Sequence, residues 1–361
     1  MLKNKFEVTL NKIEENQLKK KPKPDKLGFG VHFTDHMFVM HWNRERGWNN
    51  AEICPYRNFS LDPAAMVFHY GQEIFEGLKA YRGNNNQILL FRPQDNLERM
   101  NKSAMRLCMP RLPVEDVLKA LKALVYLDQE WVPYNEGATL YIRPTMIATE
   151  PALGLRPSEE YLFFIIMSPV GAYYAEGFNP VRIYVEDSYV RAVQGGVGEA
   201  KTGGNYAASV KALTEAQKKG YTQVLWLDAV ERKYIEEVGT SNIFIVIGDE
   251  IITPPLKGTI LPGITRDSVL QLARDLGLKT AERAVSIDEI VRANENGNLK
   301  EIFSTGTAAV ISPIGELLFK DQLIRINNGK AGELSTLFFN ELQAMQRGER
   351  EDSHNWLVRV G

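Results

Sequence analysis

The sequence predicts an α+β protein of two domains with mixed sheets. Short runs rich in β-branched and aromatic residues alternate with amphipathic stretches of helical period, so strands and helices are interleaved along the chain. The 361 residues exceed what one hydrophobic core usually serves. Helix and strand breakers gather at Ser168-Pro169-Val170-Gly171 and at Gly177-Phe178-Asn179-Pro180, which places a domain boundary near the middle of the chain.

These breaks divide the chain into four segments. Residues 1–24 are rich in lysine and end in Lys20-Lys21-Pro22-Lys23-Pro24, so we expect a frayed N-terminal arm there. Residues 25–170 should form a small α+β domain and residues 171–180 an interdomain loop. Residues 181–361 should form a larger second domain.

Each predicted element follows from a local pattern. Apolar runs of β-forming residues between turn signals predict strands over 38–42, 88–91, 139–147, 161–167, 181–185, 223–227, 243–247 and 251–253. Apolar residues at helical spacing predict helices over 96–107, 114–131, 206–219, 265–276 and 331–345. Two of these helices should end at Gly220 and Gly277, because glycine readily adopts the left-handed conformation of a C-terminal cap.

Composition excludes several classes of protein. The formal net charge of −2 gives no attraction to nucleic acid or to an anionic membrane. No apolar run approaches the roughly 18 residues of a membrane span, and the first residues lack the apolar stretch of a signal peptide. The two cysteines, Cys54 and Cys108, fit a reducing compartment. We therefore expect a soluble, cytoplasmic protein that binds neither nucleic acid nor membrane.

A metal site is not expected at the histidine cluster. His32 and His36 are four residues apart, a spacing that binds metal only on a helix, and His41 follows closely. The overlapping segment 38–42 has a strand pattern instead.

Lys201 lies between two glycine pairs, in Gly195-Gly196-Val197-Gly198-Glu199-Ala200-Lys201-Thr202-Gly203-Gly204. Glycine backbone lets a ligand approach closely, and a reachable, partly desolvated lysine can attack a carbonyl. Further along the chain, the carboxylate of Glu237 could face a protonated ring nitrogen. Such a lysine and carboxylate are the minimal set for pyridoxal phosphate chemistry. A solvated surface lysine in a glycine-rich loop would show the same residue types.

Two segments offer groups that could bind phosphate. A proline-rich loop over residues 254–263 leads into a helix at Ile264 and Thr265, where first-turn amides and a hydroxyl are available. Residues 304–309 form a hydroxyl-rich turn that could hold a phosphate or a carboxylate. An ordinary capped helix and a structural turn are the alternatives at these two places.

Two arginines are candidate anion-binding groups. Arg99 lies on a predicted helix, and an inward-facing arginine there would be a fixed cation suited to phosphate. Arg143 and Tyr141 share one face of a predicted strand, so both could point into one pocket. An arginine on a mostly apolar strand needs a buried partner, such as a substrate carboxylate.

A nucleotide-binding module is the alternative from a different class. Residues 195–202 differ at one position from the phosphate-loop pattern G-x-x-x-x-G-K-[ST], because Ala200 replaces the last glycine. That motif requires a helix starting at its lysine, which Gly203 and Gly204 disfavour. Residues 190–193 are also a poor candidate for the buried strand that must precede it.

Taken in order, these segments resemble branched-chain amino acid aminotransferases, which are pyridoxal phosphate enzymes of fold type IV. The resemblance runs from about Phe29 to Trp356. It rests on Phe75-Glu76-Gly77-Leu78-Lys79-Ala80-Tyr81, Tyr141-Ile142-Arg143-Pro144, Lys201-Thr202-Gly203-Gly204-Asn205-Tyr206, Gln223-Val224-Leu225-Trp226-Leu227, Glu237-Val238-Gly239-Thr240 and Leu261-Pro262-Gly263. The lysine, Glu-Val-Gly-Thr and Leu-Pro-Gly segments also mark the wider fold-type IV group, which leaves a D-amino acid aminotransferase or an aminodeoxychorismate-type lyase as the alternative.

The resemblance implies a D-amino acid aminotransferase-like fold with residues 181–361 as the domain that binds pyridoxal 5'-phosphate. It implies transfer of the amino group between L-leucine, L-isoleucine or L-valine and 2-oxoglutarate, with glutamate and 2-oxo acids as the other substrates. Lys201 would be the catalytic residue and would form the aldimine with the cofactor. The implied cofactor contacts are Arg99, Lys201, Tyr206, Glu237, Ile264, Thr265 and Thr307. The implied substrate contacts are Phe29, Tyr70, Phe75, Tyr141, Arg143, Tyr173, Thr240, Thr307 and Ala308. In the family, Tyr70 reaches across from the other subunit, so a homodimer is implied.

Overall fold

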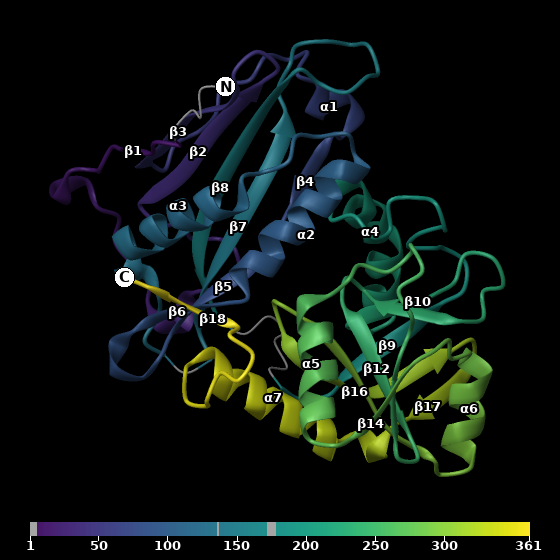
Figure 1. The fold of residues 1–361 in the computed structure, drawn as a ribbon. Coiled ribbons are helices and arrows are strands. Elements are labelled where there is room, and N and C mark those ends of the chain that lie inside the picture. Colours follow the sequence, from purple (N-terminus) through teal and green to yellow (C-terminus); the bar gives the residue numbers. More distant parts are fainter. Residues whose placement is uncertain (1–5, 136, 172–177) are drawn as a thin grey trace. The chain divides into compact units, whose positions relative to one another are not determined.

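The computed structural model describes residues 6–135, 137–171 and 178–361. The chain divides into two compact units, each with its own sheet (Figure 1). Unit 1 comprises Met1–Tyr173, Ala200–Gly203 and Ala344–Gly361, and unit 2 comprises Tyr174–Glu199 and Gly204–Gln343. The predicted α+β class with two domains and mixed sheets is confirmed.

Unit 1 is built on a nine-stranded sheet of order β1-β3-β2-β8-β7-β5-β6-β18, with β4 joined to β7. Its pairings are antiparallel except for the parallel pair β1–β3. The strands are β1 (Thr9–Leu10), β2 (His36–Asn43), β3 (Gly47–Pro55), β4 (Glu73–Phe75), β5 (Leu78–Arg82), β6 (Ile88–Phe91), β7 (Thr139–Ala148), β8 (Glu160–Val170) and β18 (Leu357–Val360). The helices of unit 1 are α1 (Met66–Tyr70), α2 (Pro93–Arg106) and α3 (Val114–Leu127).

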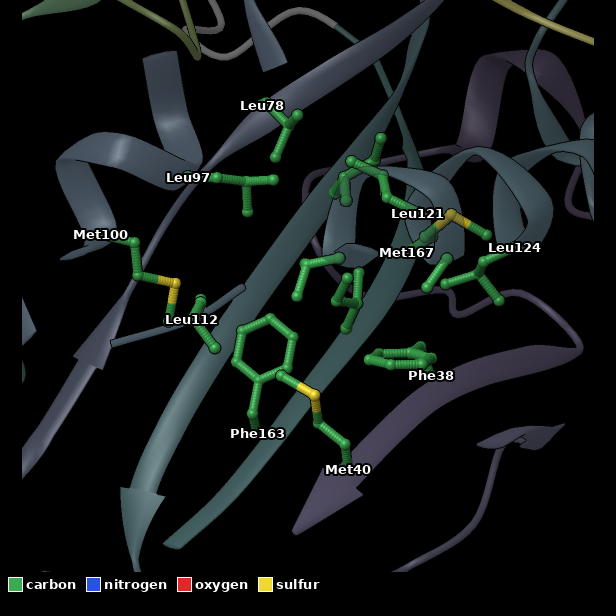
Figure 2. Close-up of a cluster of buried hydrophobic side chains, with 14 of the residues drawn as sticks. Phe38, Met40, Leu78, Leu97, Met100, Leu112, Leu121, Leu124, Phe163 and Met167 are labelled. Carbon is green, nitrogen blue, oxygen red and sulfur yellow. The ribbon is translucent and has the colours of Figure 1, made fainter. Parts of the chain in front are cut away.

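One face of this sheet packs against α2 and α3 and forms the main core of unit 1. Side chains from both helices, including Met100 and Leu121, meet strand residues such as Phe38 and Phe163 (Figure 2). Successive side chains of a strand point to opposite faces. In β7, Leu140 and Ile142 belong to this core, so Tyr141 and Arg143 lie on the other face. The predicted shared face of Tyr141 and Arg143 is therefore the face opposite the helices.

Unit 2 is built on a second nine-stranded sheet, of order β11-β10-β9-β16-β15-β12-β13-β14, with β17 joined to β16. Its pairings β9–β10, β9–β16 and β13–β14 are parallel and the rest antiparallel, so this sheet is also mixed. The strands are β9 (Val181–Glu186), β10 (Gln223–Leu227), β11 (Ile235–Val238), β12 (Asn242–Ile247), β13 (Glu250–Thr253), β14 (Lys279–Glu282), β15 (Leu299–Gly306), β16 (Val310–Phe319) and β17 (Gln322–Arg325). The helices are α4 (Gly203–Lys218), α5 (Ile264–Asp275), α6 (Ile287–Glu295) and α7 (Glu333–Gln346). The first residue of α4 and the last three of α7 are grouped with unit 1.

Most predicted elements are present within a few residues of their expected bounds. Gly220 and Gly277 follow α4 and α5 with φ of 83° and 68°, which confirms both predicted caps. The predicted helix over 114–131 is wrong at its end, since α3 stops at Leu127 and a separate 3-10 turn covers Gln129–Trp131. The predicted helix start at Tyr206 is also wrong, because α4 begins at Gly203. Glycine is costly in a helix interior, but Gly203 and Gly204 occupy the first turn of α4.

The described part of the N-terminal arm, from Phe6, is not frayed as expected. Strand β1 pairs with β3. The backbone N–H of Ile13 donates to Nε2 of His36 at 3.1 Å, and the ammonium of Lys19 donates to the Thr34 carbonyl at 2.6 Å. His36 also makes a 2.7 Å contact with the Asp128 carboxylate through Nδ1, so its ring ties the arm to unit 1.

Two segments that we expected in the second domain group with unit 1. Residues Ala344–Gly361 include β18, which pairs with β6, and residues Ala200–Gly203 are bonded to β4. Long-range strand pairing of this kind leaves no local trace in the sequence. The expected interdomain loop, 171–180, falls largely on residues 172–177, which lie outside the described residues. Over the described ranges, no helix combines the length and the apolarity needed to cross a membrane.

Glu301 should contribute to stability as a buried cap of α7. Its Oε1 accepts from the backbone N–H of Leu334 at 2.8 Å and its Oε2 from that of Ser335 at 2.9 Å. We expect Glu301→Ala to lower the free energy of unfolding by about 1.5–3 kcal/mol, as for other hydrogen bonds to charged groups. Urea unfolding followed by circular dichroism measures this change. The exposed Glu351→Ala is the control, and an equal loss in both variants would contradict the capping role.

Candidate active site

Lys201 lies in a short segment of unit 1 that is bonded to β4. The backbone N–H of Phe75 donates to the Lys201 carbonyl at 3.0 Å, and the Lys201 N–H donates to Oγ of Ser103 at 2.9 Å. The Thr202 hydroxyl donates to the Glu73 carbonyl at 2.7 Å. The two bonds of Lys201 use its backbone groups, so they fix its position without engaging its amine.

The ring of Phe75 joins Lys201 to the predicted substrate residues of unit 1. Nζ of Lys201 lies 5.0 Å from the centre of this ring, and the guanidinium carbon of Arg143 lies 4.8 Å from it. Arg143 donates from Nη2 to the Tyr141 hydroxyl at 3.0 Å, and the ring of Phe29 lies 5.1 Å from that of Tyr141. Unit 1 therefore brings Lys201, Phe29, Phe75, Tyr141 and Arg143 into one cluster with aromatic walls and two cations.

Gly77 makes room for this cluster. A Cβ built on Gly77 would overlap the hydroxyl of Tyr141. Any larger residue would displace the Tyr141 hydroxyl, which accepts from Arg143, so the glycine of the Phe-Glu-Gly segment is explained by close packing at the site.

Arg99 is buried and forms a two-point ion pair with Glu76. The contacts are 2.7 Å from Nε to Oε1 and 2.9 Å from Nη2 to Oε2. The Asn96 amide also donates to Oε2, at 2.9 Å. Burial would raise the pKa of Glu76, but Arg99, Lys201 and the Asn96 bond together hold it below its usual value. Glu76 is thus an anion that orients Arg99, a role that the sequence alone did not indicate.

Tyr70 and Tyr173 are not placed in this cluster. Tyr70 is exposed at the end of α1, and its hydroxyl donates to the Leu153 carbonyl. Tyr173 lies outside the described residues.

Glu237 is a deeply buried carboxylate of unit 2, with 1% of its surface exposed in β11. Its Oε2 lies 2.7 Å from Nη2 of Arg191, and its Oε1 accepts from the Asn242 amide at 3.1 Å. A carboxylate with a cation and an amide donor is held in its ionised form and in one orientation. This matches the chemistry expected of a partner for a protonated ring nitrogen.

Tyr206 and Thr240 line a very small hollow of unit 2, about 10 Å³ in volume. Arg191 lines it as well, together with Asn205, Ser209 and Gly239. Two predicted ligand contacts of unit 2 therefore share a hollow with the cation that pairs with Glu237.

Ile264 and Thr265 form the start of α5, as predicted within one residue. A Cβ on the preceding Gly263 would overlap the side chain of Asn242, which donates to the Leu261 carbonyl at 3.0 Å as well as to Glu237. Asn242 thus links the helix start to Glu237. First-turn amides have no carbonyl acceptor within their own helix, which makes such a start suitable for a phosphate.

The predicted hydroxyl-rich turn over 304–309 is wrong in part. Strand β15 continues to Gly306 and pairs with β16, so Ser304 and Thr305 are strand residues. The turn is limited to residues 307–309, which include Thr307 and Ala308. The cause is the antiparallel pairing of Ser304 with Ser312, which extends the apolar strand beyond Phe303.

Comparison with known proteins assigns the family. Residues 73–317 match the amino-transferase class IV family, and this match covers more than half of the chain. The chain belongs to the class IV aminotransferases. Branched-chain-amino-acid aminotransferase 2 of Bacillus subtilis (strain 168) is 54% identical over 343 residues, 94% of each chain. Branched-chain-amino-acid transaminase 1 of the same organism is 51% identical over 356 residues, 97% of this chain and 100% of the relative.

Solved structures agree with this family. The branched-chain amino acid aminotransferase of Escherichia coli has a TM-score of 0.76 at 26% identity, covering 91% of this chain and 99% of that one. The branched-chain amino acid aminotransferase of Thermobaculum terrenum, in its PLP form, has a TM-score of 0.71 at 26% identity, covering 90% of this chain and 98% of that one. The predicted membership of the branched-chain, fold-type IV aminotransferases is confirmed, and the D-amino acid aminotransferase and lyase alternative is not favoured.

The structure also removes the support for a nucleotide loop in this aminotransferase. A phosphate loop directly follows a strand, but β9 ends at Glu186, well before Gly195. The argument from Gly203 and Gly204 was wrong, however, because α4 begins at Gly203.

Proposed function

We propose that this aminotransferase transfers the amino group between L-leucine, L-isoleucine or L-valine and 2-oxoglutarate, with pyridoxal 5'-phosphate as its cofactor. The proposal is supported by the names of its relatives, which are 50–54% identical over nearly the whole chain. The observation that carries it is the cluster around Phe75, in which the Lys201 amine and the Arg143 cation lie within 5.0 Å of one aromatic ring. Such a cluster offers a nucleophilic amine beside aromatic rings suited to an aliphatic chain and a cation suited to a carboxylate.

The residues present fit pyridoxal phosphate. Glu237 is a buried carboxylate held by a cation, α5 begins at Ile264 next to Asn242, and Arg99 is a fixed guanidinium. When bound, the cofactor supplies an electron sink for the substrate Cα–H bond. We assign Glu237 to the ring nitrogen and Tyr206 to the phenolic oxygen. We assign the phosphate to Arg99, to the amides of Ile264 and Thr265 and to Thr307.

Lys201 has two tasks in this proposal. Its amine holds the cofactor before substrate arrives, and once released it moves a proton at the substrate Cα. The backbone bonds of Lys201 to Phe75 and Ser103 fix the backbone that carries this amine.

The remaining predicted residues are assigned to the substrate. Phe29, Phe75 and Tyr141 provide an aromatic wall for the branched chain, which the hydrophobic effect favours by about 25 cal/mol per Å² of apolar surface buried. Arg143 offers a charge for the second carboxylate of glutamate. We further assign Tyr70, Tyr173, Thr240, Thr307 and Ala308 to the substrate.

A panel of amino donors tests the proposed function. With 2-oxoglutarate as acceptor, L-leucine, L-isoleucine and L-valine should each give glutamate, whereas D-leucine and D-alanine should not. A preference for the D-enantiomers would support the D-amino acid aminotransferase, and release of pyruvate from added aminodeoxychorismate without an acceptor would support the lyase.

Arg143→Met should reduce kcat/KM for glutamate more than for leucine. A hydrogen bond to a charged group contributes about 1.5–3 kcal/mol, so the additional loss for glutamate should be about tenfold or more. The steady-state kcat/KM of both donors measures it. Because Arg143 also donates to Tyr141, Tyr141→Phe serves as the control that removes the acceptor but keeps the charge. Equal losses for the two donors would assign Arg143 to the carboxylate that all substrates share.

We also propose that the enzyme is a homodimer that uses the surface of α1 and the 151–155 segment. Phe68 is exposed on α1, and Leu153 and Leu155 are exposed on the 151–155 segment. The hydrogen bond from the Tyr70 hydroxyl to Leu153 and the β-bridge between Ala65 and Pro151 join this segment to α1. An apolar patch of this kind on a soluble protein marks an interaction surface.

Leu155→Glu should shift the enzyme toward a monomer of 40.9 kDa, because burying a charge at an apolar interface is costly. Leu155 is 82% exposed in the single chain, and the control, Val230→Glu, replaces a residue 90% exposed in unit 2. Sedimentation of both variants at equal concentration measures the effect. An unchanged mass for Leu155→Glu would place the subunit contact on another surface.

We propose the cytoplasm as the location. Cys54 is a free, buried thiol and Cys108 is a free, exposed one, which agrees with a reducing compartment. Burial raises the pKa of the Cys54 thiol to about 11, so this group stays protonated and unreactive.

A further inference from the structure

Arg191 is a buried cation to which neither the sequence motifs nor the proposed function gives a role. Its side chain is 6% exposed, and Nη2 lies 2.7 Å from Oε2 of Glu237. The same guanidinium donates from Nη1 to the Thr259 carbonyl at 2.7 Å, and both of its terminal nitrogens approach the Gly198 carbonyl at 3.3–3.4 Å.

These three partners belong to three separate segments of unit 2. Glu237 lies in β11, Gly198 lies in the glycine-rich run that leads to Lys201, and Thr259 lies in the loop that leads to the start of α5. A Cβ on Gly198 would come within 2.5 Å of the Thr259 carbonyl oxygen, so these two segments pack directly against each other. The guanidinium of Arg191 thus joins the strand that carries Glu237, the run that leads to Lys201 and the loop that leads to Ile264, and all three residues are proposed cofactor contacts.

We propose that Arg191 is a positioning residue for the transamination reaction: it keeps Glu237 ionised and aimed, and it fixes the two loops that flank this carboxylate. The proposal rests on the proposed role of Glu237 toward the ring nitrogen. Arg191 itself is not assigned to substrate, cofactor or any reacting atom.

The charge of Arg191 explains how Glu237 can be both buried and anionic. An isolated buried carboxylate takes up a proton and becomes neutral, and a neutral acid cannot stabilise a protonated ring nitrogen. A guanidinium in contact with one oxygen keeps the group ionised, and Asn242 binds the other oxygen. A carboxylate has about four acceptor positions, so Glu237 can accept from donors beyond these two.

The shape of the guanidinium explains why this position requires arginine. Its planar fork presents several N–H groups in fixed directions, so one side chain can bind two carbonyls while its charge lies 2.7 Å from Oε2 of Glu237. A lysine ammonium carries a similar charge but cannot match three partners in this geometry.

The neighbouring Glu236 is not the direct partner of Arg191. Its Oε1 accepts from the Thr259 hydroxyl at 2.6 Å. Burial raises the pKa of Glu236, which the Thr259 bond and the Arg191 charge oppose. Arg191 therefore acts on Glu236 only through its field, whereas it touches Glu237.

A mutant cycle tests the proposal on the complete enzyme. The variants are Arg191→Gln, Arg191→Lys, Glu237→Gln and the double variant Arg191→Gln/Glu237→Gln. The control is Arg182→Gln, which removes an exposed arginine paired with Glu316 from the same unit. For each, we would measure kcat and KM for leucine, the dissociation constant for pyridoxal phosphate by titration of the apoenzyme, and the melting temperature of the apoenzyme.

We expect Arg191→Gln to lower kcat by about 10- to 100-fold, as when partners that orient metal ligands are removed, with a smaller change in KM. Pyridoxal phosphate binding should weaken, and Arg191→Lys should restore part of kcat because it restores the charge. The kcat of the double variant should lie within about twofold of the kcat of Glu237→Gln, because without the carboxylate Arg191 has no catalytic group to hold.

The outcomes separate this inference from the proposed function. Losses that multiply in the double variant, or a kcat unchanged by Arg191→Gln, would overturn the positioning role. If Glu237→Gln alone retains the wild-type kcat, the proposed role of Glu237 is wrong and the inference falls with it. If Arg191→Gln fails to fold, Arg191→Lys replaces it. The kcat of Arg191→Lys is then compared with that of the double variant Arg191→Lys/Glu237→Gln.

Discussion

Lys201→Ala is expected to lower transamination by about 10⁴-fold or more, because one substitution removes both the amine that holds the cofactor and the group that moves the proton at Cα. The fold should be little changed, since Lys201 is anchored through its backbone N–H and carbonyl to Ser103 and Phe75. Pyridoxal phosphate should still bind through its phosphate contacts, but without the visible absorbance that a lysine linkage gives. The single-turnover rate with leucine and the absorption spectrum of the purified variant measure these effects.

Lys211→Ala is the matched control for that substitution. Lys211 lies on α4 with its side chain 67% exposed and pairs with Glu215 at 2.9 Å. Its loss should leave both rate and spectrum unchanged. Near-normal turnover and an unaltered spectrum in Lys201→Ala would contradict the assignment of Lys201 as the catalytic lysine.

Local patterns were sufficient to predict the elements that have strong periodicity or clear stops. The strand at 88–91 and the helix closed by Gly220 are examples, because each depends on residues within a few positions of one another. Strands β15 and β16 were not predicted, because β15 has near its end the hydroxyl-bearing residues Ser304 and Thr305, which have the composition of a turn. Their strand conformation comes from pairing with β16. The place of β18 in the first sheet depends on a partner more than 260 residues away in the chain, and no local rule reveals such a pairing.

The candidate site also contains residues that the sequence indicated and residues that only the fold revealed. Lys201 and Glu237 could be proposed from the sequence because few residue types can serve as a nucleophilic amine and an anionic ring partner, and Lys201 stands between glycine pairs. Glu76 and Arg191 were missed as partners, because their roles depend on which charge lies beside them in the folded chain. The only sequence signal for either is a charged residue within an otherwise apolar or glycine-rich segment, and that signal is shared by many surface residues.

The position of the Lys201 backbone was also not predictable from the sequence. Its sequence neighbours from Gly204 onward belong to unit 2, yet residues Ala200–Gly203 are bonded to β4 in unit 1. Gly203 is needed for this packing, because a Cβ there would overlap the Glu73 carboxyl group.

Glu237→Gln is expected to lower kcat by about 100-fold or more, since a neutral amide no longer stabilises positive charge on the ring nitrogen as electrons are withdrawn from the substrate. The structure adds a second effect that the sequence did not indicate. Arg191 and Glu237 are 6% and 2% exposed in their side chains, so removal of the carboxylate leaves a buried cation without its partner. Breaking a buried pair in this way costs about 3–5 kcal/mol, and the apoenzyme of the variant should melt at a lower temperature.

Rate and melting temperature together distinguish the two effects of Glu237. Glu237→Asp keeps the charge for Arg191 but shortens the side chain, so it should retain more stability than Glu237→Gln while still losing rate. Single-turnover kinetics with leucine and thermal unfolding of the apoenzyme measure both quantities. A wild-type rate in Glu237→Gln, with or without a loss of stability, would show that Glu237 is only a structural partner of Arg191 and that the ring nitrogen is bound by another group.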